Sequence, residues 1–380
     1  MKITIASMNL STNCTNRCLR LGQALAPHYE VEIVGPTFGI GKNWGKGIWP
    51  PLEKVDIPIR SVAGDIMPMF VKSIRNLLKI MDGDVIIACK PRFPSFGVAL
   101  IKRALSGTPV ILDIDDDELA QTLPAKSFRL RRKLSHTHEY QYTSWVHRLH
   151  SKADAVFTVS ENFRKTYGGV IVPHGMDPNE LDPAKFNRET IRLELGIKPS
   201  DIIIGFVGTP NPQKGIDLIL KALQIINRPE LKLMIVGAEP EDDYVKFMNQ
   251  QYGRHLILIP LQPLDLIPYF LSANDLVVLP QRNCPETFGQ MPAKLTDAMA
   301  MGKTVIAAAR ADIPKYLEGR GLLFDAENLE ELISHLVWCL NNRFEAQQLG
   351  EKARIYFLNN LTLNAMFEAM EPSIKHCLNQ

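Results

Sequence analysis

The second half of the chain is constrained most strongly by short apolar runs that alternate with stretches whose apolar residues have helical spacing. Such runs begin near Ile202, Leu231, Leu256, Leu276, Thr304 and Gly321. Short runs rich in branched apolar residues are typical of strands buried on both faces, and strands that alternate with helices usually pair in parallel. We therefore predict an α/β domain over residues 198–360, built on a doubly wound parallel sheet.

The first half shows the same alternation. Its predicted strands are Lys2–Ala6, Val31–Val34, Asp84–Cys89, Thr108–Ile114, Asp154–Val159 and Gly169–Pro173. A chain of 380 residues is too long for one ordinary α/β core, so two domains are expected. The polar, proline-containing segment Asp177–Pro199 reads as the linker, which predicts a first domain over residues 1–190.

Composition narrows the class of protein. Apolar residues make up 46% of the chain and charged residues 22%, as in globular domains, and a net charge of +2 does not favour a nucleic-acid partner. Six cysteines without paired short spacings indicate reduced thiols rather than a disulfide framework or a metal site. No apolar run has the roughly 18 residues of a membrane span, so a cytoplasmic protein is expected.

A loop from Gly208 to Gly215 follows the predicted strand at Ile202 and precedes a helix. Small residues and prolines make the loop tight, the N-terminus of the next helix offers free N–H groups, and Lys214 adds a full positive charge. These features suit a diphosphate, with Gly208, Thr209 and Lys214 as contacts. The loop lacks the ending of a Walker motif. The alternative is a plain strand-to-helix turn with one surface lysine.

A second loop and helix follow the predicted strand at Leu276. The loop carries Glu286, Phe288, Gly289 and Gln290, and a helix that opens near Pro292 carries Lys294 and Asp297. Open α/β sheets bind ligands at the carboxyl ends of their strands, which makes these side chains candidate contacts for a substrate. The alternative is an ordinary crossover with solvated charges.

An acidic run ends the predicted strand at Thr108. Asp113 is followed by Asp115, Asp116, Asp117 and Glu118. Such a run needs cations or hydrogen-bond donors, and one of its carboxylates could act on a substrate hydroxyl. Asp113 and Asp115 also form the short Asp-x-Asp pattern that holds a divalent metal in another class of sugar transferase. A solvated, acidic loop end is the third interpretation.

Residues 126–152 combine basic side chains with interleaved aromatic and aliphatic ones. This amphipathic segment suits contact with anionic lipid or with a phosphate-bearing acceptor, and a surface helix packed by its aromatic side is the alternative. The histidines here lack the spacing of a helical metal pair, so no metal is predicted.

Three motifs together resemble the GT-B glycosyltransferases of family 4. They are the strand and loop from Gly205 to Gly215, the turn Val172–Asp177, and the block from Glu286 to Gly302. The resemblance implies two facing Rossmann-like domains, with a final helix (361–380) that returns to the first domain. It also implies transfer of a sugar from a UDP-, GDP- or ADP-sugar to an acceptor hydroxyl, with retention of configuration and without a metal or other cofactor.

The resemblance also implies roles for individual residues. Lys214 would hold the donor diphosphate, Glu286 would contact the donor sugar, and Asp297 would bind the ribose. The backbone of Phe288–Gln290 would lie along sugar and phosphate. Glu286, Asp115 and Asp116 are the predicted catalytic residues. On the acceptor side the predicted contacts are Asn13, Thr15 and His174.

The chain departs from the family pattern at several positions. Lys294 stands where many members have a second glutamate, Thr209 follows the glycine where an arginine is common, and Asp115 or Asp116 replaces a first-domain histidine. Two alternatives to a transferase of this type follow. One is a nucleotide-sugar-binding protein with impaired catalysis, and the other is a metal-dependent transferase that uses Asp113 and Asp115. The base, sugar, acceptor, linkage and oligomeric state are left open.

Overall fold

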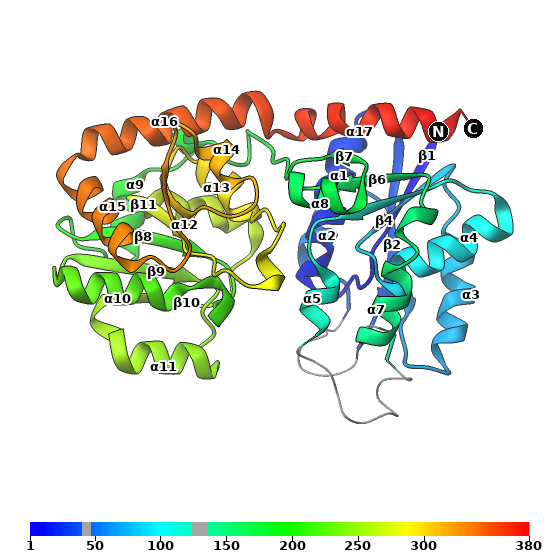
Figure 1. The fold of residues 1–380 in the computed structure, drawn as a ribbon, viewed down its shortest axis with the longest axis horizontal. Coiled ribbons are helices and arrows are strands. Elements are labelled where there is room, and N and C mark those ends of the chain that lie inside the picture. Colours follow the sequence, from blue (N-terminus) through cyan, green and yellow to red (C-terminus); the bar gives the residue numbers. More distant parts are fainter. Residues whose placement is uncertain (40–46, 124–135, 138, 380) are drawn as a thin grey trace. The chain divides into compact units, whose positions relative to one another are not determined.

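A computed structural model describes residues 1–39, 47–123, 136–137 and 139–379. The chain forms two compact units (Figure 1). Unit 1 comprises Met1–Gly175 and Leu363–Gln380, and unit 2 comprises Met176–Thr362. Each unit is a parallel sheet covered by helices, which confirms the predicted fold class.

Unit 1 contains a seven-stranded sheet in the order β3-β2-β1-β4-β5-β6-β7. The strands are β1 (Lys2–Ala6), β2 (Glu30–Thr37), β3 (Ile59–Ala63), β4 (Val85–Cys89), β5 (Val110–Ile114), β6 (Ala155–Thr158) and β7 (Val170–Ile171). Its described helices include α1 (Asn16–Leu25), α2 (Pro50–Glu53), α3 (Phe70–Ile80), α4 (Val98–Ser106), α5 (Glu118–Thr122), α7 (Tyr140–His147), α8 (Glu161–Tyr167) and α17 (Leu363–Leu378). The edge strand β3 was not predicted, because it is mostly exposed and therefore lacks a continuous apolar run.

Unit 2 contains a six-stranded sheet in the order β10-β9-β8-β11-β12-β13. The strands are β8 (Ile202–Val207), β9 (Leu231–Val236), β10 (Leu256–Ile259), β11 (Leu276–Leu279), β12 (Thr304–Ala308) and β13 (Leu322–Phe324). The helices are α9 (Arg188–Glu194), α10 (Ile216–Ile226), α11 (Asp243–Tyr252), α12 (Ile267–Ala273), α13 (Ala293–Ala300), α14 (Ile313–Leu317), α15 (Leu329–Asn341) and α16 (Arg343–Asn360). The apolar runs of the sequence therefore predicted each strand of this sheet.

The final helix α17 belongs to unit 1 and packs beside α1. The Phe367 ring stacks on His28, just beyond the end of α1, with ring centroids 3.7 Å apart. Residues 176–190, assigned to the first domain from the sequence, lie in unit 2. There Arg354 of α16 donates to the carbonyl of Leu181 at 2.9 Å and to Asp182 at 3.1 Å.

Both sheets reverse their winding direction at one point. In unit 1 the strands run outward from β1 on one side and from β4 on the other, and in unit 2 from β8 and from β11. Loops at the carboxyl ends of two such strands diverge to opposite faces and leave a crevice, which is the usual ligand site of open α/β sheets. The loops after β1, β4, β8 and β11 are therefore the places to look for function.

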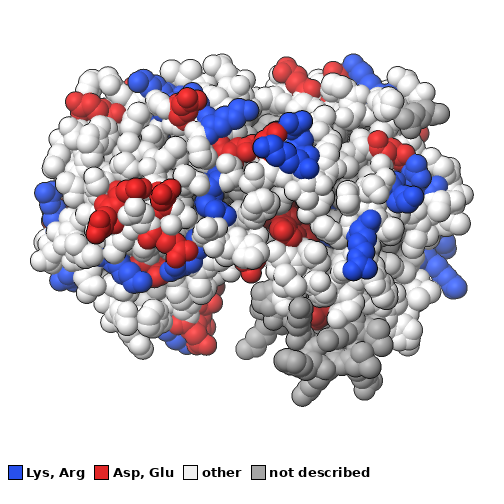
Figure 2. All heavy atoms as spheres, in the orientation of Figure 1, with Lys and Arg blue, Asp and Glu red and all other residues white. Residues whose placement is uncertain are grey.

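The surface carries charges of both signs. Figure 2 shows basic and acidic side chains interspersed on the visible face, in keeping with the small net charge of +2. Within the described part of the chain, no helix is both long enough and apolar enough to cross a membrane.

Candidate functional site

In unit 2, the loops after β8 and β11 are in direct contact. Gly215 has a φ of +69°, and a Cβ atom there would lie 2.0 Å from the carbonyl oxygen of Pro280. Gly237, after β9, approaches the first loop from the other side, where a Cβ would lie 3.0 Å from the Gly208 carbonyl carbon. Only glycine allows these approaches at positive φ. The glycines at these positions therefore hold the 208–215 loop against the end of β11.

Two lysines from different elements converge on this loop. Lys214 donates to the side-chain oxygen of Gln290 at 3.3 Å, and Gln281 donates to the same oxygen at 2.9 Å. The Lys294 Nζ, from the first turn of α13, lies 4.1 Å from the centroid of the Phe206 ring. A Cβ on Gly208 would be only 2.9 Å from that Nζ. Lys214, Gln290 and Lys294 are thus brought together as the sequence predicted for one site.

The two lysines affect each other electrostatically. Burial and the nearby positive charge of Lys214 together lower the pKa of Lys294 to about 7, while Asp297 acts in the opposite direction. A buried cation is stabilised when an anion binds beside it. The pair therefore suits a phosphate-bearing ligand.

The loop after β11 presents the other predicted contacts. The Phe288 side chain is 49% exposed, Gly289 has a φ of +142°, and Thr209 is exposed on the neighbouring loop. Glu286 and Asp297 are partly buried. Within the part of the chain that the structure describes, no hydrogen bond or ion pair engages the Glu286 carboxylate, so it is available to accept from sugar hydroxyls.

In unit 1, Asp113 is not part of an open metal site. Its carboxylate is buried and accepts from Arg17, with Nη2 to Oδ1 at 2.9 Å and Nε to Oδ2 at 3.1 Å. Arg17 also donates to the carbonyls of Val172 and Pro173 at 3.0 Å and 2.9 Å. A buried, bidentate pair of this kind ties α1 to β5 and the end of β7. The Asp-x-Asp interpretation of Asp113 and Asp115 is therefore wrong for Asp113.

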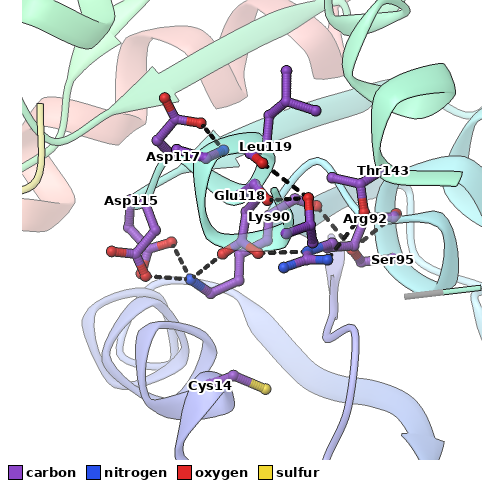
Figure 3. A network of polar contacts seen from close by, with 12 residues as sticks. Cys14, Lys90, Arg92, Ser95, Asp115, Asp117, Glu118, Leu119 and Thr143 are labelled. Carbon is purple, nitrogen blue, oxygen red and sulfur yellow. Dashed lines mark hydrogen bonds and ion pairs between the residues drawn. The ribbon is translucent and has the colours of Figure 1, made fainter. Parts of the chain in front are cut away.

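Three of the other acids of the run surround a buried lysine (Figure 3). Lys90 follows β4 and places its Nζ 3.0 Å from Asp115, 2.6 Å from Asp116 and 2.7 Å from Glu118. These three carboxylates are close enough together to hold a metal ion, but the lysine ammonium lies among them. Lys90 is therefore the positive charge that the acidic run needs.

Lys90 was missed by the sequence analysis, as was its neighbour Arg92, which pairs with Glu118 and donates to the Thr143 hydroxyl at 3.0 Å. The available signal was their position directly after a buried strand. Lys90 has a φ of +69°, which is uncommon for a residue with a side chain. This conformation directs the lysine at the end of β4 toward the acids that follow β5.

Asp116 is the most exposed member of the network. Its side chain is 20% exposed, against 11% for Asp115, 5% for Lys90 and 2% for Glu118. Burial raises the pKa of Asp115 to about 7, with Lys90 opposing the shift and the neighbouring acids adding to it. The Asp116 carboxylate is therefore the most accessible to solvent, with the buried Asp115 beside it.

The predicted acceptor-side residues differ in how deeply they are buried. Asn13 is exposed, His174 is partly buried, and Thr15 is fully buried. Thr15 therefore supports the loop after β1 and does not present its side chain at the surface. The basic part of the predicted amphipathic segment, residues 126–135 and 138, lies outside the described residues. The described remainder forms α7 and the short turn His150–Lys152.

Comparisons with known proteins show a match to a family model within unit 2. Residues 187–356 match the model of the family described as "Glycosyl transferases group 1". Among curated proteins, D-inositol 3-phosphate glycosyltransferase of Segniliparus rotundus is 30% identical over 38% of this chain and 32% of its own length. The chain spans less than two thirds of the first curated relatives it matches, with shares of 32%, 40% and 57%.

Solved structures resemble the chain over its full length. Sucrose-phosphate synthase from Thermosynechococcus elongatus has a TM-score of 0.75 at 16% identity, covering 100% of this chain and 99% of its own. Anabaena HepE in complex with UDP and glucose has a TM-score of 0.75 at 19% identity, covering 99% of each chain. Identities this low establish the fold alone, which is the two-domain fold of these proteins.

Proposed function

Because residues 187–356 of this chain match the model of the group 1 glycosyl transferases, we propose that the protein belongs to this family and moves a sugar from a nucleotide diphosphate sugar to an acceptor hydroxyl. The observation that supports this most directly is the convergence of Lys214 and Lys294 beside the Glu286 loop, at the winding reversal of unit 2. Cations there suit the diphosphate, and the Glu286 carboxylate, which has no partner among the described residues, suits the sugar.

The donor is proposed to be a UDP-, GDP- or ADP-sugar. HepE of Anabaena, which shares the fold, was solved with UDP and glucose. In this chain Lys214 and Lys294 would face the diphosphate, Glu286 the sugar and Asp297 the ribose. The free N–H groups at the start of α10 add to the positive potential.

Transfer breaks the bond between the sugar's anomeric carbon and the diphosphate oxygen and forms a bond from that carbon to the acceptor oxygen. The acceptor hydroxyl loses its proton, which the departing diphosphate can accept. Negative charge develops on the departing diphosphate, where Lys214 and Lys294 would stabilise it. Two lysines can supply this charge without a metal, so we propose a metal-independent reaction. Retention of configuration is proposed from the family resemblance.

The acceptor is proposed to bind unit 1. Asp116 has a partly exposed carboxylate with the buried Asp115 beside it, and carboxylates accept hydrogen bonds from hydroxyl groups. Their negative charge would repel an acceptor phosphate at the same place. We therefore propose a hydroxyl-bearing acceptor, a glycan, glycolipid or small molecule, that is uncharged where it meets these acids.

The test is turnover of UDP-, GDP- and ADP-sugars, measured as release of the nucleoside diphosphate, with and without EDTA. We expect one base to support turnover that EDTA leaves unchanged, and loss of turnover in Glu286→Gln. Turnover abolished by EDTA would instead support a metal-dependent transferase. Binding of a nucleotide sugar without turnover, across a panel of hydroxyl acceptors, would support the alternative of a binding protein with impaired catalysis.

We also propose a cytoplasmic location with peripheral contact to anionic lipid through residues 126–152. In the described part of this segment, Trp145 and Leu149 are 56% and 42% exposed, beside the exposed Arg148 and Lys152. Exposed aromatic and basic side chains favour a membrane interface. The protein should float with vesicles containing phosphatidylglycerol and less with phosphatidylcholine alone, and Trp145→Ser should weaken flotation. Equal recovery with both vesicles would contradict the proposal.

A further inference from the structure

Arg282 lies between the two loops of the proposed donor site and contacts both. It follows β11 by a few residues, and it has no role in the sequence analysis. Its side chain reaches the loop after β8, and its main chain holds the start of the loop that carries Glu286.

The side chain of Arg282 holds the loop of Lys214. Its Nε donates to the Pro212 carbonyl at 3.0 Å, and its Nη2 donates to both oxygens of Asp217 at 2.8 Å and 2.7 Å. The Arg282 backbone N–H adds a bond to the Gln213 carbonyl at 3.1 Å. Since Asp217 lies in the first turn of α10, Arg282 holds the second half of the loop and the start of the helix that follows it.

The main chain of Arg282 holds the loop of Glu286. Its carbonyl accepts from the Thr287 hydroxyl at 2.6 Å and from the Cys284 N–H at 3.2 Å. The Thr287 N–H in turn donates to the Cys284 carbonyl at 3.1 Å. These bonds close the short turn that contains Glu286 and leads directly to Phe288.

We propose that Arg282 is a positioning residue that sets the separation between the diphosphate-binding and sugar-binding loops. The inference rests on the proposed function, since it concerns the two halves of one donor. Diphosphate and sugar are joined covalently, so both contacts can be made together only at one loop separation. Without Arg282 each half still binds alone, but the two no longer align for reaction.

If Arg282 aligns the two loops, its loss should reduce catalysis much more than it reduces binding of the nucleoside diphosphate. In Arg282→Ala, affinity for the free nucleoside diphosphate should stay within about threefold of wild type, because Lys214 and Lys294 remain. The value of kcat/KM for the sugar donor should fall about 100-fold, as is typical of a misplacement near 1 Å. Arg282→Lys should not restore it, because a lysine cannot bond Asp217 and Pro212 together.

Two further variants separate positioning from a general structural effect. Lys221 pairs with the same Asp217 at 3.2 Å from the exposed side of α10, so Lys221→Ala is the matched control and should behave as wild type. In a Glu286→Gln background, Arg282→Ala should lower kcat/KM much less than it does in the wild type. The reason is that the contact between residue 286 and the sugar, which Arg282 would align, has already been weakened.

The experiment uses the full chain, with the nucleoside diphosphate and nucleotide sugar that wild type turns over among the UDP, GDP and ADP series. Binding is measured by calorimetry and turnover by steady-state kinetics at a temperature where each variant is folded. Equal losses of affinity for both ligands, or unchanged kcat/KM, would overturn the positioning role while leaving the proposed function intact. A wild type that neither binds nor turns over any nucleotide sugar would overturn both.

Discussion

A Lys214→Met variant is expected to lose about 100- to 1,000-fold in kcat for sugar transfer, because its ammonium would stabilise the charge that develops on the departing diphosphate. The side chain sits where the loops after β8 and β11 meet, hydrogen-bonded to Gln290 at 3.3 Å. Methionine keeps much of the side-chain volume and removes the charge. The measurement is the initial rate at saturating donor and acceptor.

Lys246 is the control for this prediction. It is an exposed lysine of unit 2 that pairs with Glu241 at 2.9 Å, remote in sequence from both loops. Lys246→Met should transfer sugar at the wild-type rate. If Lys214→Met also kept the wild-type rate, Lys214 would have no part in the reaction, and the diphosphate site would have to lie elsewhere.

A Lys90→Met variant is expected to lose about 3–5 kcal/mol of unfolding free energy from unit 1 at pH 8, because a buried charge network is left without its central cation. Lys90 lies within 3.0 Å of each of three carboxylates. Urea unfolding measures the loss. Hydrogen exchange at the amides of β4 and β5 should show that the loss is located in unit 1.

The loss of unfolding free energy in Lys90→Met should be smaller at pH 5 than at pH 8. The folded-state pKa of Asp115 is already raised to about 7, above its ordinary value, so the folded state binds this proton more tightly than the unfolded state. Protonation therefore stabilises the fold as the pH falls below 7. Removal of Lys90 should raise the pKa of Asp115 further and should raise the pKa of Glu118, which Arg92 and Lys90 now hold below its ordinary value. Protonation of these acids at low pH would then partly offset the loss of the cation.

Glu118→Gln provides the matched second change. In the Lys90→Met background Glu118 keeps its pair with the buried Arg92, so the second change leaves that arginine without its carboxylate and the double variant should be less stable at pH 8 than Lys90→Met alone. In the wild-type background the same change removes a partner of Lys90 and Arg92 and should be destabilising. A Lys90→Met variant as stable as wild type at pH 8 would contradict a central role for this cation.

Some site residues could be assigned from sequence because the signal was local. Gly208, Lys214 and the Glu286 loop each follow an apolar strand directly, and parallel strands bring such loops to one edge of the sheet. The metal-binding interpretation of Asp113 was wrong because it used only the short Asp-x-Asp pattern, which is local. The partner of Asp113 is Arg17, which lies in helix α1, far away in sequence.

The sequence by itself determined the alternation of strands and helices, because buried parallel strands and amphipathic helices each leave a local pattern of apolar residues. Only the tertiary structure decided which charges meet. Lys90 among three acids, Arg17 on Asp113, and Arg282 between two loops each join segments far apart in the chain. Such pairs depend on the order of the strands in the sheet. Because they are buried, each pair affects stability, since a charge removed from water needs a partner.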